Sequence, residues 1–150
     1  PQAVGTGADI SPKALEIARE NGKKLGVDAR VQWQESDLFS NLADKTFDWI
    51  VSNPPYLTAA DMQQLQPEVR HDPAMALFGG PDGLDIYRRL AKESPKHVKK
   101  DGYLAVEIGA GQAADVVAIF TQDGWYTHIK TVKDYGGIER VILFSRKERI

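Results

Sequence analysis

The sequence contains no cysteine, which excludes disulfide bonds and any site that depends on a thiolate. No apolar stretch is long enough to cross a bilayer, and no basic segment followed by an apolar one opens the chain. The 19 Lys and Arg residues are outnumbered by 21 Asp and Glu residues, so the positive surplus typical of nucleic-acid-binding proteins is missing. These absences fit a cytoplasmic protein and argue against a membrane or a nucleic acid as its partner.

What is present is the composition of an ordinary globular domain, with 42% hydrophobic and 27% charged residues. A chain of 150 residues can bury most of its apolar surface in one core, so we expect residues 1–150 to form a single domain. Two short basic clusters, residues 96–100 and 146–149, are interpreted as a solvated helix end and a solvated tail. No metal site is expected, because the histidines lie at unrelated spacings: His71, His97 and His128.

The first third of the chain alternates between strand and helix patterns. Residues 3–10 are typical of a strand weakened by two glycines, and Ser11-Pro12 supplies an N-cap followed by proline at the first helical position. Apolar residues at helical spacing continue to Gly26, which is the expected stop. Two further strands are expected, one near residues 31–33 and one over residues 47–52.

The segment 57–85 contains too many helix breakers for a continuous helix: Pro67, Pro73, Gly79, Gly80, Pro81 and Gly83. A segment of this length with little regular structure is uncommon in a compact domain unless it is a lid or a binding loop. We therefore expect a long functional loop here, with one short helix over residues 60–65.

The remaining sequence predicts two helices and three strands. The helices are expected over residues 84–98, where Pro95 ends or bends the helix, and 112–122. The strands are expected over residues 103–108, 125–132 and 140–145. The link between the last two strands is short and contains Gly136-Gly137, so it suits a hairpin. The whole pattern predicts an α/β fold with a mostly parallel, Rossmann-like sheet that ends in an antiparallel C-terminal hairpin.

The most informative stretch is Asn53-Pro54-Pro55-Tyr56, here called the Asn-Pro-Pro-Tyr loop, which directly follows an apolar strand. Its two prolines lack amide hydrogens and fix their own φ, so the chain must leave the sheet in a rigid extended turn. Asn53 adds a side-chain amide and Tyr56 adds a flat aromatic face. Such a strip could hold a planar NH2 group, and that group could be methylated.

A turn that merely ends a strand is the alternative interpretation, because Asn and Pro are common turn formers. The position of the loop favours a site. Ligands of open α/β sheets bind outside the carboxyl ends of strands, and the loop lies at such an end.

Several segments closely resemble the HemK-type release factor glutamine methyltransferases, which are class I S-adenosylmethionine-dependent methyltransferases. The segments are Asp9-Ile10-Ser11, Ser36-Asp37-Leu38-Phe39, residues 51–56, Pro67-Glu68-Val69, residues 76–84 and Glu107-Ile108-Gly109. Amino-methylating enzymes that act on adenine or guanine share the Asn-Pro-Pro-Tyr loop. The segment from Pro67 to Leu84 is what separates the HemK-type enzymes from those, and the resemblance covers nearly the whole chain.

This resemblance implies transfer of a methyl group from S-adenosylmethionine to the side-chain nitrogen of the glutamine in a Gly-Gly-Gln loop of a translation release factor, leaving S-adenosylhomocysteine. An amide nitrogen is a poor nucleophile, so the site must hold it in line with the methyl carbon and polarise it. The implied catalytic residues are Asn53, Pro54, Pro55 and Tyr56. Asn53 Oδ1 and the Pro54 carbonyl would accept the amide hydrogens, and Tyr56 would pack on the flat amide, so neither a metal nor a covalent nucleophile is needed.

For the cofactor, the resemblance implies that Asp9 accepts the ribose hydroxyls, with Ile10 beside it. Asp37 would bind the exocyclic amine of adenine and Leu38 would contact the ring, and Asn53 belongs to the cofactor-binding set as well. The residues by themselves leave other roles open, namely a helix cap for Asp9 and a turn Asp beside a core Leu for Asp37 and Leu38.

The sequence departs from this family at one point. A first strand and a glycine-rich loop around the methionine part of the cofactor are absent here, as is the helical N-terminal substrate-recognition domain. Gly5-Thr6-Gly7 is a Gly-x-Gly, but it lies inside a strand just before Asp9 and so cannot be that loop. The chain therefore resembles the C-terminal part of such an enzyme, truncated at its N-terminus.

The missing strand normally lies between the strand that ends in Asp9 and the strand that ends in Ser52. Unpaired buried strand edges leave hydrogen bonds unmet, so we expect either direct pairing of those two strands or filling of the slot by another chain. Two other functions stay open. One is a nucleic-acid amino-methyltransferase, which would have a basic groove beside Tyr56, and the other is a non-catalytic remnant that binds no cofactor.

Overall fold

The computed structural model of this chain describes residues 2–67 and 69–148. The chain divides into two compact units, Pro1–Lys45 and Thr46–Ile150, and each is described by itself. Two residues named above, Glu68 of a family segment and Arg149 of the basic tail, lie outside the described residues. The expectation of a single domain stays a prediction.

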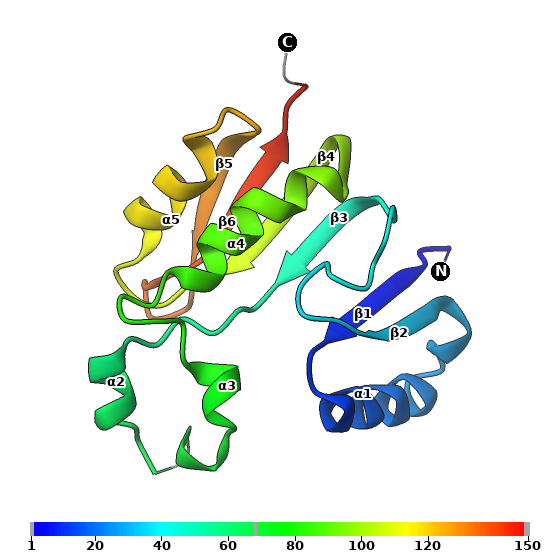
Figure 1. The fold of residues 1–150 in the computed structure, drawn as a ribbon, viewed down its shortest axis with the longest axis horizontal. Coiled ribbons are helices and arrows are strands. Elements are labelled where there is room, and N and C mark those ends of the chain that lie inside the picture. Colours follow the sequence, from blue (N-terminus) through cyan, green and yellow to red (C-terminus); the bar gives the residue numbers. More distant parts are fainter. Residues whose placement is uncertain (1, 68, 149–150) are drawn as a thin grey trace. The chain divides into compact units, whose positions relative to one another are not determined.

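The first unit is a β-α-β arrangement, as expected (Figure 1). Strand β1 (Gly5–Asp9) is followed by helix α1 (Pro12–Lys24), the short helix η1 (Asp28–Arg30) and strand β2 (Val31–Glu35). The two strands pair in parallel along their whole length. The N-cap prediction is confirmed, because Ser11 Oγ accepts the amide of Ala14 at 3.2 Å.

Glycines in the first unit give room to one large side chain. A Cβ atom built at Gly7 would lie 2.5 Å from the ring of Trp33, and one built at Gly22 in α1 would lie 3.1 Å from it. The ring of Trp33 on β2 therefore packs against two glycines, in space that a Cβ atom would fill. Gly7 lies inside β1, as expected, and its role there is to make room for Trp33.

The second unit contains a four-stranded sheet in the order β3-β4-β6-β5. Its strands are β3 (Phe47–Ser52), β4 (Val98–Glu107), β5 (Tyr126–Lys133) and β6 (Glu139–Arg146). Strands β3 and β4 are parallel, whereas β6 runs antiparallel to both β4 and β5. The predicted antiparallel hairpin is therefore confirmed.

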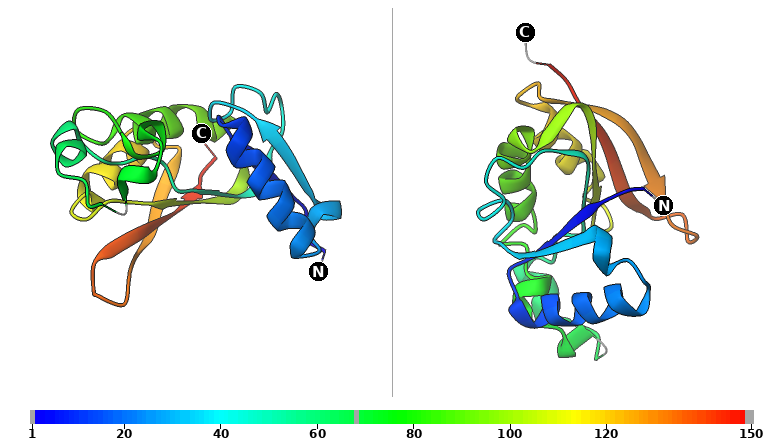
Figure 2. Two further views of the ribbon diagram at one scale, coloured as in Figure 1. Left: turned by 90° about the horizontal axis from the view of Figure 1, so that it is seen from below. Right: turned by 90° about the vertical axis from the view of Figure 1, so that its right-hand side faces the viewer.

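Helices α4 (Asp85–Glu93) and α5 (Ala113–Thr121) cover one face of this sheet (Figure 2). Alternate residues of the strands point to that face, and they form the core with apolar residues of the helices. The fully buried members include Tyr87, Leu90, Leu104, Val106, Val116, Phe120, Ile142 and Phe144. Among them, the rings of Phe120 and Phe144 stack with their centroids 4.8 Å apart.

The helix expected over residues 84–98 is shorter than predicted. It ends at Glu93, a short helix η3 (Ser94–Lys96) follows, and β4 begins at Val98, before the predicted start at Tyr103. Pro95 has no amide hydrogen with which to continue the helix. In addition, Ser94 Oγ hydrogen bonds to the Tyr126 hydroxyl at 2.8 Å in the buried core, which holds the chain at this point.

The segment expected to be a long loop contains two short helices and an η turn. These are α2 (Ala59–Gln63), η2 (Val69–His71) and α3 (Ala74–Leu77), so one predicted helix is confirmed with slightly different bounds and α3 was not predicted. Helix α2 begins with a capping box between Thr58 and Asp61. The Thr58 amide and hydroxyl donate to the Asp61 carboxylate and keep the pKa of Asp61 below its usual value.

Strand β1 pairs with β2, and β3 pairs with β4, in separate sheets. Direct pairing of the strand that ends in Asp9 with the strand that ends in Ser52 stays a prediction, because the two strands belong to different units. Filling of the slot by another chain stays a prediction. Within residues 2–67 and 69–148, no helix is both long enough and apolar enough to cross a membrane.

The carboxylate of Asp134 organises the hairpin turn between β5 and β6. Its Oδ1 accepts the amides of Gly136 at 2.8 Å and Ile138 at 3.0 Å, and its Oδ2 accepts Arg140 Nε at 3.0 Å. These bonds, led by the one from the Ile138 amide, hold the pKa of Asp134 below its usual value. A carboxylate whose pKa is lower in the folded state stabilises the fold at pH values above the ordinary Asp pKa. This stabilisation is lost as the pH falls through the lowered pKa.

We expect acidification to loosen this turn only at a pH below the ordinary Asp range. The amide signals of Gly136 and Ile138 in NMR spectra should titrate with a midpoint below that of an unperturbed Asp, and Asp134→Asn should abolish the titration. A midpoint at the ordinary Asp value would show that the carboxylate does not hold the turn.

Candidate functional site

The Asn-Pro-Pro-Tyr loop directly follows the carboxyl end of β3, whose last residue, Ser52, pairs with Val106 of β4. Pro54 is buried, whereas Asn53 is exposed and Tyr56 is half-buried. Within the described residues, the carboxamide of Asn53 makes no hydrogen bond, so its oxygen can accept one from a ligand. A rigid backbone thus presents a polar group that the fold itself does not use.

Two glycines of the turn formed by residues 79–85, here called the glycine turn, lie against this loop. A Cβ atom at Gly79 would stand 2.7 Å from the Pro55 carbonyl oxygen and 2.8 Å from Tyr56 Cα. A Cβ atom at Gly83, where φ is +75°, would collide with the Tyr56 carbonyl oxygen. Only glycine allows this close approach of two backbones, so the glycine turn fixes the position of the Asn-Pro-Pro-Tyr loop.

Backbone hydrogen bonds extend the same contact along the chain. The Leu57 amide donates to the Leu77 carbonyl, and the Gly79 amide donates to the Leu57 carbonyl, both at 2.9 Å. A parallel bridge between Leu57 and Phe78 results. The segment that contains α2 and α3 therefore starts and ends at the same point, directly after the Asn-Pro-Pro-Tyr loop (Figure 1).

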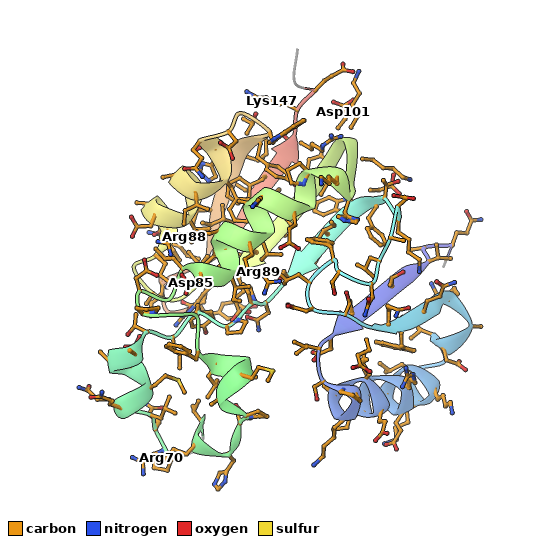
Figure 3. All side chains as sticks on the ribbon, in the orientation of Figure 1. Arg70, Asp85, Arg88, Arg89, Asp101 and Lys147 are labelled. Atoms are coloured by element: carbon orange, nitrogen blue, oxygen red, sulfur yellow. The ribbon has the colours of Figure 1, made fainter. Side chains whose placement is uncertain are left out.

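An ion pair holds the glycine turn to the start of α4. Arg88 donates to both carboxylate oxygens of Asp82, at 2.6 and 3.1 Å, and its Nη1 lies 3.0 Å from Asp85 Oδ1. Figure 3 shows Asp85 and Arg88 together near the N-terminal end of α4. The bond from Arg88 is the main reason why the pKa of Asp82 is lowered. The pair is exposed, so its effect is geometric: a bidentate contact orients the turn.

Tyr87 of α4 lies in the core, and its hydroxyl donates to the Glu107 carbonyl at 2.7 Å. Burial is the main cause that raises the pKa of Tyr87 far above its ordinary value, and the nearby Tyr56 and Glu107 raise it further. Tyr87 therefore stays neutral and serves as a fixed hydrogen-bond donor that ties α4 to the end of β4.

In the first unit, the structure brings together the predicted nucleoside-binding residues at the carboxyl ends of β1 and β2. The Ser36 amide donates to the Asp9 carbonyl at 2.9 Å, so the turn that carries Asp37 and Leu38 lies next to Asp9 and Ile10. Asp9 Oδ1 accepts the amide of Ser11 at 2.8 Å, which is the capping role considered above. Asp9 Oδ2 has no donor among the described residues, so the carboxylate can also accept a bond from a ligand.

The side chain of Ser36 supports the turn at Asp37 and Leu38. Sequence patterns predicted no separate role for Ser36. Leu38 has a φ of +51°, which is uncommon for a residue with a branched side chain. Ser36 is buried, its hydroxyl donates to the Leu38 carbonyl at 2.8 Å, and it accepts the Asn41 amide at 3.0 Å. These two bonds compensate for the unfavourable backbone conformation of Leu38.

Replacing Ser36 by alanine should destabilise the chain by about 1–3 kcal/mol, because the Leu38 carbonyl and the Asn41 amide both lose a partly buried partner. Urea denaturation measures this change. Ser40→Ala is the comparison variant: Ser40 is exposed, and its Oγ accepts the Asp37 amide at 3.2 Å and lies 3.4 Å from Ser36 Oγ, so its loss leaves the bonds from Ser36 to Leu38 and Asn41 in place. Equal losses in the two variants would contradict the supporting role of Ser36.

The predicted site residues thus form two groups, one in each unit. Sequence reasoning missed Gln112, whose side chain bonds to the loop, and the close contacts of Gly79 and Gly83. Glycines in the segment 57–85 did signal irregular backbone, but nothing in the sequence linked them to Tyr56.

The methyltransferase small domain family model matches residues 1–72 of the chain. A release factor glutamine methyltransferase of Geobacter sulfurreducens is 44% identical over 143 residues, covering 95% of this chain and 49% of that protein. A ribosomal protein uL3 glutamine methyltransferase of Bradyrhizobium diazoefficiens is 45% identical over 112 residues, covering 75% of this chain and 35% of that protein. The chain spans about half the length of the release factor glutamine methyltransferases that it matches.

A crystal structure of a methyltransferase from Pyrococcus furiosus matches the fold with a TM-score of 0.70 at 19% identity, covering 95% of this chain and 62% of that one. This likeness confirms the expected α/β, Rossmann-like class I methyltransferase fold with its antiparallel C-terminal hairpin. The sequence comparisons confirm the expected family resemblance. Over nearly its whole length, the chain is therefore similar in sequence to one half of the release factor glutamine methyltransferases.

Proposed function

We propose that this chain is part of a methyltransferase that uses S-adenosylmethionine to methylate a glutamine side-chain nitrogen in the Gly-Gly-Gln loop of a translation release factor. The observation that carries the proposal is the exposed carboxamide of Asn53, which makes no hydrogen bond to any described residue, on a backbone held rigid by Pro54, Pro55 and the glycine turn. The 44% identity to the Geobacter enzyme supports the same activity.

The proposed task of the Asn-Pro-Pro-Tyr loop is to hold and polarise an amide group. Asn53 Oδ1 and the Pro54 carbonyl would accept the two hydrogens of the glutamine NH2, which raises the electron density on its nitrogen. Tyr56 would pack its ring on the flat amide, and Pro55 keeps the chain between these groups extended. A nitrogen held in one direction needs less reorganisation to react, which is a large part of the rate that an enzyme can supply.

The first unit offers groups that fit the nucleoside part of the cofactor. Asp9 Oδ2 can accept ribose hydroxyls, and Ile10, the next residue, is 46% exposed. Asp37 would accept from the adenine amine, and Leu38, fixed by Ser36, offers an apolar contact. When bound, S-adenosylmethionine supplies a methyl group that its positively charged sulfur makes electrophilic.

The relative that acts on ribosomal protein uL3 favours a second candidate with the same chemistry, in which the glutamine belongs to a ribosomal protein. Methylation of a nucleic-acid base stays as the third possibility, since the Asn-Pro-Pro-Tyr loop fits any planar amino group. The net charge of −2 offers no support for it.

A parallel labelling experiment separates these substrates. The chain, extended upstream to the length of its relatives, is given S-adenosylmethionine with a tritiated methyl group, together with a release factor, with uL3 or with RNA. We expect label in the release factor, and none when the glutamine of its Gly-Gly-Gln loop is replaced by asparagine. Label in uL3 alone or in RNA alone would replace the proposed substrate. No label in any of them, with no heat on titration of millimolar S-adenosylmethionine, would support a non-catalytic remnant.

A further inference from the structure

The side chain of Gln112 joins three segments of the second unit that are far apart in the sequence. Its Oε1 accepts the amide of Gly109 at 2.9 Å, just after the end of β4. Its Nε2 donates to the carbonyl of Tyr56 at 3.1 Å and to the carbonyl of Gly83 at 3.3 Å. One carboxamide thus connects β4, the Asn-Pro-Pro-Tyr loop and the glycine turn.

The chemistry of these partners fixes the orientation of the Gln112 carboxamide. Only the carboxamide oxygen can accept a hydrogen bond from a backbone N–H, and only the carboxamide NH2 group can donate to the two carbonyls. The surroundings are also tight, because a Cβ atom would lie 2.8 Å from Nε2 if built at Gly83 and 2.9 Å from Oε1 if built at Gly109. The glycines leave the space that the side chain fills.

A helix cap does not account for this arrangement. Gln112 is the N-cap residue of α5, but its side chain makes no capping hydrogen bond to that helix. Its NH2 group instead points to the two carbonyls on segments that precede α5 by many residues. The carboxamide is therefore placed for a contact between segments.

We propose that Gln112 is a positioning residue for the methyl transfer described above, an inference that rests on the proposed function. β3 fixes the upstream end of the Asn-Pro-Pro-Tyr loop, and Gln112 fixes its last carbonyl, that of Tyr56. Because both ends of the Asn-Pro-Pro-Tyr loop are held, the acceptor oxygens of Asn53 and Pro54 keep a fixed orientation. Gln112 does not contact the glutamine substrate itself; it acts through Tyr56.

The matched variants Gln112→Glu and Gln112→Ala separate this role from a local one. Glutamate keeps an oxygen for the Gly109 amide but sets a charged oxygen against the carbonyls of Tyr56 and Gly83. Protonation of that carboxyl restores one donor, so the defect should be reversed by acid. Gln122, which is exposed at the other end of α5, gives the controls Gln122→Glu and Gln122→Ala.

Amide hydrogen exchange of this chain, followed by NMR and corrected for the intrinsic pH dependence of exchange, reads the contact without an activity assay. We expect the amides of Leu57 and Gly79 to lose protection by about 10-fold or more in both Gln112 variants, because their bonds to the carbonyls of Leu77 and Leu57 depend on the position of Tyr56. The Gly109 amide should lose protection only in Gln112→Ala. Acid should restore the protection of Leu57 and Gly79 in Gln112→Glu alone. Unchanged protection, or a loss in Gln112→Glu that acid does not reverse, would overturn the proposal.

Kinetics on the upstream-extended chain provide the second measurement. Both Gln112 variants should lower kcat for release factor methylation by about 10-fold or more, with a smaller change in KM, since a misaligned loop slows the reaction more than it weakens encounter. The Gln122 controls should leave both constants unchanged. A wild-type kcat in Gln112→Glu at neutral pH would refute the positioning role. Failure of the unmodified chain to transfer methyl groups would count against the proposed function, and the exchange data would still decide the role of Gln112.

Discussion

Replacement of Asn53 by alanine is expected to lower the turnover of methyl transfer by about 10²-fold or more, because removal of one preorganised polar group from a catalytic site commonly has an effect of this size. The side chain is exposed and makes no hydrogen bond among the described residues, so its loss should leave the fold intact. Turnover is measured with a release factor substrate and the upstream-extended chain, and the free energy of unfolding is measured in parallel.

Asn21→Ala is the matched control for this experiment. Asn21 is an exposed asparagine in α1, and no hydrogen bond of its side chain is found in the described part of the chain. We expect it to keep full turnover. Unchanged turnover in Asn53→Ala would refute the role assigned to Asn53. It would also refute the proposal that the Asn-Pro-Pro-Tyr loop holds and polarises the substrate amide.

Replacement of Gly83 by alanine should have the second large effect, this time on both stability and activity. The new methyl group would collide with the Tyr56 carbonyl oxygen and lie 2.8 Å from Gln112 Nε2, at a residue whose φ is +75°. The positive φ costs about 1–2 kcal/mol for a residue with a Cβ atom, and overpacking adds about 1–3 kcal/mol. The free energy of unfolding should therefore fall by roughly 2–5 kcal/mol.

Another glycine provides a control that separates the cost of the clash with Tyr56 from the cost of the positive φ. Gly111 has a φ of +82°, close to that of Gly83, but a Cβ atom built there would have no neighbour within 4 Å. Gly111→Ala should therefore show only the backbone cost and should keep its activity. Equal destabilisation of the two variants in urea denaturation would mean that Gly83 does not act through contact with Tyr56.

Sequence patterns predicted most accurately those elements whose signals are local. The start of α1 follows from Ser11-Pro12, because an N-cap and a proline act within one turn of the backbone. The strand over residues 47–52 and the C-terminal hairpin were also predicted correctly, since alternation and link length are local properties. By contrast, the start of β4 was placed too late, because Val98 joins that strand by pairing with Phe47, a residue far away in the sequence.

The candidate site divides in the same way. Its polar groups could be identified from sequence because Asn53, the two prolines and Tyr56 are consecutive, and because Asp9 and Asp37 follow predicted strands. The residues that support them could not be identified in this way. Ser36 bonds to the backbone of its own turn, but its burial is a property of the folded unit. Gln112 is the N-cap residue of α5, and no motif in the sequence marks it.

By itself, the sequence determined the order of strands and helices, the stiffness of the Asn-Pro-Pro-Tyr loop and the chemical groups available there, because caps, prolines and periodicity act between near neighbours. The tertiary structure alone decided that Gly79, Gly83 and Gln112 meet this loop. These contacts join segments separated by long stretches of chain, and close backbone approach leaves no repeating pattern in the sequence. A glycine in the sequence does not show which group packs against it, because that group is brought there by the tertiary structure.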